Sequence, residues 1–100
     1  MESKQTQLLQ TYETLLVSWD KTHNLISFGQ RKNLKQHIED SLSVSLMIGE
    51  YVVDLGSGGG LPGIPLAITN PQKQFLLVES NTKKASFLLN TVTKLDLKNT

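Results

Sequence analysis

The chain has 100 residues, of which 38% are hydrophobic and 19% charged, a composition typical of one globular domain. It contains no cysteine and only two histidines, which excludes a disulfide framework and a thiol nucleophile and argues against a metal site. The formal net charge is +1, so charge alone does not indicate a nucleic-acid partner. Because the sequence shows no signal peptide and no apolar run near the roughly 18 residues of a membrane span, we expect a cytoplasmic protein without a membrane partner.

The first half of the chain shows helical periodicity. Apolar residues recur at three- and four-residue spacing over 8–19, which predicts a helix of about four turns with one apolar stripe. The polar stretch 21–29 predicts a connecting loop, and 31–48 a second helix with Gly49 as its C-terminal cap. We therefore expect an N-terminal helical segment over 1–49.

Residues 50–100 change to a pattern of strand, helix, strand and helix. Two apolar runs, 51–55 and 74–79, predict strands that are buried on both faces of a parallel sheet. A helix is expected up to Ile68, ended by Asn70, and another up to Leu95 after a cap at Ser80 or Asn81. The predicted fold class is α/β, with N-terminal helices followed by the first βαβα part of an open sheet.

A glycine-rich stretch directly after the first predicted strand is the most specific feature of the sequence. Five of the eight positions from Gly56 to Gly63 are glycine. Residues without a Cβ let the chain turn sharply from a strand into a helix while a ligand approaches the backbone. In open α/β folds this turn lies at the carboxyl edge of the sheet, where nucleotides bind. We therefore expect a small-ligand site at this turn.

The class of nucleotide follows from the residues around the glycines. Gly58, Gly60 and Gly63 satisfy the G-x-G-x-x-G pattern of dinucleotide-binding enzymes, which leaves an NAD- or FAD-binding oxidoreductase as an alternative. However, Pro62 removes an N–H group that a pyrophosphate would need, and Asp54 would repel its charge. S-adenosylmethionine has no phosphate and carries positive sulphonium and ammonium groups, which suit Asp54. The sequence favours this cofactor.

An acidic residue ends the second predicted strand. Glu79 lies 19 residues after Gly60, the distance at which a carboxylate in this topology accepts hydrogen bonds from both ribose hydroxyls. Because parallel neighbouring strands bring their carboxyl ends together, the glycine loop and Glu79 are expected to form one site.

The residues from Val52 to Ile68, VVDLGSGGGLPGIPLAI, resemble the glucose-inhibited division protein B family. The stretches 19–25, 37–41 and 79–88 resemble family segments in the same order. Members of this family are bacterial methyltransferases that use S-adenosylmethionine to modify a guanine ring nitrogen, N7, of 16S ribosomal RNA. The resemblance implies a Rossmann-like methyltransferase domain whose first half is 50–100. It also implies a partner in ribosomal RNA or the small ribosomal subunit, and a monomeric complete protein.

The resemblance also implies roles for particular residues. The cofactor-binding positions are Asp54, Gly56, Ser57, Gly58, Gly60, Leu61 and Glu79. The positions expected to shape the site or contact the substrate are Asn24, His37, Asp40, Ser41 and Lys83. No catalytic side chain is assigned, since the guanine nitrogen has a free lone pair and its methylation needs alignment rather than a base.

Several alternatives stay open at this point. One alternative is that His37 forms a purely structural pair with a nearby aspartate. Another is that Lys83 and Lys84 belong to a solvated helix face. The chain could also be a non-catalytic module that docks on a protein through residues 1–48. Because members of the resembling family are longer, we expect an N-terminal fragment that is inactive alone.

Overall fold

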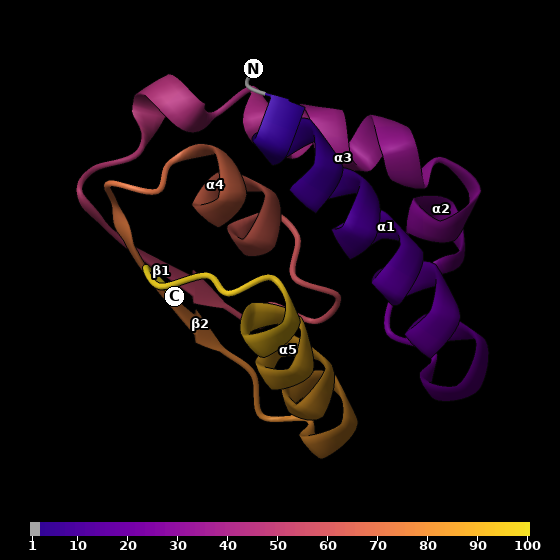
Figure 1. Ribbon diagram of the computed structural model, residues 1–100. Helices are drawn as coiled ribbons and strands as arrows, with labels where there is room; N and C mark the ends of the chain where they lie inside the picture. The colour runs from indigo at the N-terminus through magenta and orange to yellow at the C-terminus, as the bar shows by residue number, and fades with distance from the viewer. Residues whose placement is uncertain (1–2) are drawn as a thin grey trace.

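The computed structural model describes residues 3–100, and it follows the expected order of helices and then alternating strands and helices (Figure 1). The elements in chain order are α1 (Ser3–His23), α2 (Phe28–Lys32), α3 (Leu34–Leu42), the short 3-10 helix η1 (Ser45–Met47), β1 (Tyr51–Leu55), α4 (Gly63–Thr69), β2 (Gln74–Val78) and α5 (Thr82–Lys94). Within residues 3–100, no helix is long and apolar enough to cross a membrane.

The two strands form the parallel pair that the sequence predicts. Tyr51 lies opposite Gln74, and Leu55 opposite Val78, so the strands are in register along their whole length. Helix α4 connects them, and its expected end at Asn70 is confirmed. Both strands therefore end at the same edge of the sheet, directly before the glycine loop and Glu79.

The expectation that both faces of the sheet are buried is wrong for one face. The side chains of Val53 and Leu76 are 59% and 60% exposed, whereas Phe75, on the opposite face, is 5% exposed. Figure 1 shows α4 and α5 on the same side of the sheet. Because side chains alternate between the faces of a strand, helices on one side cover only every second residue.

The N-terminal helices differ from the prediction in their lengths. Helix α1 is longer than four turns and continues to His23, and α2 begins at Phe28, so the loop predicted over 21–29 shrinks to four residues, 24–27. Ser27 starts α2 because its side chain accepts a hydrogen bond from the backbone N–H of Gln30, whose own side chain bonds back to Ser27. This reciprocal capping box is a strong local start signal.

The prediction of a single helix over 31–48 is also wrong. The chain leaves helical geometry at Asn33, between α2 and α3, and α3 ends at Leu42. The Ser43 hydroxyl donates to the backbone oxygen of Asp40 at 2.6 Å, a bond that competes with helix continuation. The predicted cap at Gly49 is therefore wrong as well, since the helix has already ended.

The cap predicted for the last helix is confirmed. The side chain of Asn81 accepts a hydrogen bond from the backbone N–H of Lys84 at 3.0 Å. This bond satisfies one of the free donors in the first turn of α5. The start of α5, and with it the position of Lys84, is thereby fixed next to the carboxyl end of β2.

The core lies where α1 packs against α4 and α5. Tyr12 and Leu16 of α1, Ile64 of α4 and Phe87 of α5 are completely buried. Tyr12 also donates its hydroxyl hydrogen to the backbone oxygen of Gly59 at 2.7 Å. Burial, and secondarily the charge of Asp54, raises the pKa of Tyr12, so the hydroxyl keeps the proton that it donates. The N-terminal helix is thus attached to the glycine loop.

Replacing Tyr12 by phenylalanine is expected to lower the free energy of unfolding by about 1 to 2 kcal/mol, because the buried oxygen of Gly59 loses its donor. Urea denaturation measures the change. Tyr51→Phe is the matched control, since the Tyr51 side chain is 81% exposed. Equal stability of the two variants would contradict a stabilising role of the Tyr12 bond.

Candidate functional site

The glycine loop is attached to the end of the neighbouring strand. The backbone N–H groups of Gly56 and Ser57 both donate to the oxygen of Val78, at 2.7 and 3.2 Å. Gly58 has a φ of 55°, in the left-handed region that favours glycine. The loop therefore turns back over the carboxyl edge of the sheet.

The loop also packs tightly against the N-terminal half of the chain. A Cβ at Gly59 would lie 2.6 Å from the Cγ2 atom of Ile26 and 3.0 Å from the Cδ1 atom of Leu16. A side chain at this position would force Ile26 and Leu16 to shift. The loop is thus held between the sheet on one side and α1 with residues 24–27 on the other.

Glu79 binds the loop rather than projecting freely into solvent. Its Oε1 atom accepts a hydrogen bond from the N–H of Gly58 at 2.7 Å, and its Oε2 atom accepts one from the N–H of Asn81 at 2.9 Å. The bonds from Asn81 and Gly58 hold the pKa of Glu79 below its usual range. Glu79 is therefore a carboxylate at neutral pH, and it joins the loop to the start of α5.

Asp54, at the end of β1, holds the start of the next helix. Its Oδ2 atom accepts a hydrogen bond from the N–H of Gly63 at 3.2 Å. Burial raises the pKa of Asp54, and the nearby charge of Glu79 raises it further, while the bonds from Gly63 and Ser57 oppose the shift. The N-terminus of α4 thus already has a carboxylate next to it.

An ion pair between the exposed Arg31 and the buried Asp20 fixes the residues on the far side of the loop. Arg31 binds the carboxylate of Asp20 through Nε and through Nη2, and the Nη2 atom also donates to the oxygen of Ile26 at 3.0 Å. Asp20 accepts from the N–H of Ile26 as well, at 3.2 Å. The bond from Arg31 is the main cause that lowers the pKa of Asp20. No local sequence pattern links two residues so far apart, so this pair was not predicted.

The glycine loop and residues 24–30 line an open cavity of about 390 Å³. Five residues predicted for the site line it, namely Asn24, Gly56, Ser57, Gly58 and Leu61. The residues that the prediction missed there are Leu25, Ile26, Ser27, Gln30, Gly59 and Lys84. The stretch 19–25, which resembles a family segment, was the available signal for Leu25, because its last two residues, Asn24 and Leu25, line the cavity.

The other predicted cofactor residues do not line this cavity. Glu79 binds Gly58 of its loop and lines a smaller cavity of about 250 Å³ beside β2 and α5. Asp54 binds Gly63 at the start of α4, and Gly60 is buried against Ile64. Of the two neighbouring lysines, Lys84 faces the cavity of about 390 Å³, whereas Lys83 is exposed and lines neither this cavity nor the next.

The remaining predicted residues gather in a second cavity of about 310 Å³. His37, Asp40 and Ser41 of α3 line it together with Leu61, which also lines the first cavity. The Ser41 hydroxyl donates to the backbone oxygen of His37 at 2.9 Å, and Asp40 Oδ1 accepts from Gln36 Nε2 at 2.8 Å. Within residues 3–100, His37 and Asp40 form no hydrogen bond or ion pair with each other, so the alternative of a structural pair is not supported.

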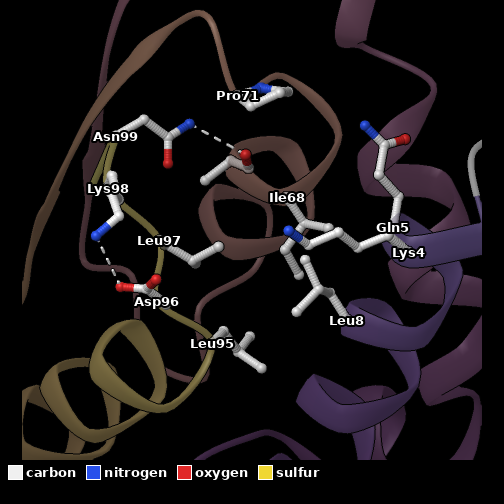
Figure 2. Close-up of a pocket in the computed structure, with 11 residues that line it drawn as sticks. Lys4, Gln5, Leu8, Ile68, Pro71, Leu95, Asp96, Leu97, Lys98 and Asn99 are labelled. Carbon is white, nitrogen blue, oxygen red and sulfur yellow. Dashed lines mark hydrogen bonds and ion pairs between the residues drawn. The ribbon is translucent and has the colours of Figure 1, made fainter.

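A third cavity, of about 460 Å³, lies away from the glycine loop (Figure 2). Leu8, Ile68 and Leu97 form apolar walls, and Lys98 and Asp96 form an exposed ion pair at 3.3 Å beside them. None of the residues predicted for the site lines this cavity. We therefore place the candidate site at the glycine loop.

Comparison with known proteins shows which family the chain resembles. The model of the family described as rRNA small subunit methyltransferase G matches residues 5–100. The chain belongs to this family. Three curated relatives bear the name ribosomal RNA small subunit methyltransferase G. The chain is 46% identical to the one from Chromobacterium violaceum over 98 residues, 46% identical to the one from Actinobacillus succinogenes over 101 residues, and 49% identical to the one from Xanthomonas oryzae over 90 residues.

These alignments cover 95%, 99% and 88% of the chain but only 47%, 48% and 42% of the respective relatives. The chain therefore spans about half the length of the methyltransferase G proteins that it matches. The resemblance derived from the glycine motif is confirmed at the level of the family.

Replacing Gly59 by alanine is expected to lower the free energy of unfolding by about 1 to 3 kcal/mol, because the added methyl group would overlap Ile26 and Leu16. Gly49→Ala is the matched control, since a Cβ there meets nothing within 4 Å. Thermal denaturation followed by circular dichroism compares the two. If Gly59→Ala is as stable as the control, the loop does not require this close packing.

The lowered pKa of Glu79 predicts a dependence of stability on pH. Its ionised form is favoured in the folded state, so its contribution is fully present above the pKa of the unfolded chain and is lost as the pH falls through the folded pKa. The free-energy difference between the chain and its Glu79→Gln variant is therefore expected to shrink on acidification below about pH 4. Urea denaturation at several pH values measures it, and a constant difference would contradict the assignment.

Proposed function

We propose that the glycine loop binds S-adenosylmethionine together with Glu79 on one side and the cavity of about 390 Å³ on the other. In the complete protein, this half of the chain would hold the cofactor for methylation of N7 of a guanine in 16S ribosomal RNA. The observation that carries the proposal is the pair of hydrogen bonds by which Glu79 holds Gly58 and Asn81. Family membership supports the reaction class, and the geometry supports the choice of cofactor.

Glu79 retains the capacity to bind a ribose. A carboxylate has about four acceptor positions, and two of those on Glu79 are used by the N–H groups of Gly58 and Asn81. The remaining two suit the 2′ and 3′ hydroxyls of a nucleoside whose ribose lies beside Gly58, on the side of the loop where Glu79 lines the smaller cavity. A volume of about 390 Å³ lies in the usual range for small-molecule pockets.

The start of α4 argues against the dinucleotide alternative. In a dinucleotide enzyme, free N–H groups at this helix terminus bind a pyrophosphate. Here the N–H of Gly63 is bound to the carboxylate of Asp54, and that of Ile64 to the oxygen of Gly60. An incoming pyrophosphate would meet a carboxylate there, whereas the positively charged arm of S-adenosylmethionine would be attracted to it.

In the proposed reaction, the role of this chain is to position the cofactor and the guanine base. S-adenosylmethionine supplies a methyl group on a positively charged sulphur. Guanine N7 has a lone pair and no proton, so no side chain needs to act as a base, and rate enhancement comes from holding the two reactants about 3 to 3.5 Å apart. The backbone of the glycine loop would hold the nucleoside, and Lys84 would lie beside the carboxylate of its amino-acid arm.

The same proposal covers the fold, the RNA partner, the location and the oligomeric state of the complete protein. A Rossmann-like sheet would extend the β1–β2 pair, and the partner would be 16S ribosomal RNA, free or in the small subunit. We infer a cytoplasmic, monomeric enzyme from the same family resemblance.

Calorimetry tests the cofactor site. We would use a chimera in which this chain replaces the matching 98-residue segment of the Chromobacterium violaceum relative, with S-adenosylhomocysteine as the ligand. Glu79→Gln is expected to weaken binding about tenfold or more, because bonds from the ribose to a charged acceptor are lost. Glu50→Gln, an exposed carboxylate at the other end of β1, should bind like the unsubstituted chimera. Binding of NAD instead would contradict the proposal.

Methyl transfer tests the reaction. The chimera is expected to label small-subunit RNA from a strain that lacks this modification, using S-adenosylmethionine with a radioactive methyl group. The 100-residue chain alone is expected to transfer a negligible amount, because residues 3–100 supply only two strands and leave one sheet face exposed. Transfer by the chain alone at the rate of the chimera would show that the site is already complete.

A further inference from the structure

Two of the cavities that predicted site residues line adjoin each other. Leu61 and Gln30 line both the cavity of about 390 Å³ beside the glycine loop and the cavity of about 310 Å³ beside α3. The second cavity lies between the polar face of α3 and the residues that lead into α4. A group bound there would therefore lie next to a ligand on the glycine loop.

We propose that the second cavity receives the guanine base that is methylated and that Asp40 recognises it. This inference rests on the proposed function and names the place and the recognition of its substrate. Methyl transfer requires donor and acceptor about 3 to 3.5 Å apart, so the acceptor base must occupy space that adjoins the cofactor cavity. The shared wall at Leu61 satisfies this requirement.

The carboxylate of Asp40 suits the donors of guanine. One oxygen, Oδ1, accepts a hydrogen bond from Gln36 Nε2 at 2.8 Å, which orients the group. The other oxygen, Oδ2, has no partner among residues 3–100. Guanine presents N1–H and an exocyclic amine on its Watson–Crick edge, both donors, whereas adenine presents an acceptor at N1. Asp40 would thus accept from guanine and reject adenine.

The same arrangement leaves the reactive atom free. N7 lies on the Hoogsteen edge of the purine and N1 on the Watson–Crick edge, so a base held by Asp40 at N1 keeps N7 free to face the cofactor. Leu61 and Pro62 supply apolar surface for the plane of the base. The half-buried His37 lies beside Asp40 on α3, and its ring is available for stacking.

The test uses the chimera described above with Asp40→Asn, which keeps the shape of the side chain and removes its charge. Glu39→Gln is the matched control, because Glu39 is the exposed neighbour on α3 and lines a different cavity, with Leu9 and Ile38. Two quantities are measured for each variant: kcat/KM for unmodified small-subunit RNA and the Kd of S-adenosylhomocysteine. Asp40→Asn is expected to lower kcat/KM about tenfold or more while changing the Kd less than about twofold. Glu39→Gln should change neither.

Unchanged kcat/KM in Asp40→Asn, or an equal loss of cofactor affinity, would overturn the inference. If Asp40→Asn lowers the melting temperature, His37→Gln provides the second variant, and it must show the same selective loss. Failure of the proposed function gives a different result, because the unsubstituted chimera would then bind no S-adenosylhomocysteine and transfer no methyl group. That result would contradict both proposals.

Discussion

The bond from the Gly58 N–H to the Glu79 carboxylate is the contact on which the geometry of the site depends. It joins two segments that the sheet brings together, the loop after β1 and the residue after β2. Because the second oxygen of Glu79 accepts from Asn81, the start of α5 is attached to the same carboxylate. One side chain thus sets the distance between loop, strand and helix.

The N-terminal helices complete the site rather than forming a separate module. Tyr12 binds the oxygen of Gly59, and the Asp20–Arg31 pair holds Ile26 against the same glycine. These contacts make residues 24–27 the outer wall of the cavity. Helix α3 adds the second cavity, so the first half of the chain contributes to both parts of the proposed site.

The sequence was most informative where structure depends on neighbours along the chain. The parallel strands, the end of α4 and the Asn81 cap follow from local patterns, and the structure confirms them. The break at Asn33 has no side-chain cap hydrogen bond to mark it. The bond between Tyr12 and Gly59 joins residues 47 positions apart, which no window of local periodicity contains. For the same reason, Lys84 could not be distinguished from Lys83 before α5 was placed.

The close packing around Gly59 affects how a ligand would be received. The loop already has its backbone fixed by Val78, Tyr12 and Glu79, and a neighbouring side chain fills the space where a Cβ would lie. A preformed binding site of this kind loses little conformational entropy when a ligand binds, so more of the contact energy is retained as affinity. Encounter would then be limited by diffusion and orientation, without a slow ordering step.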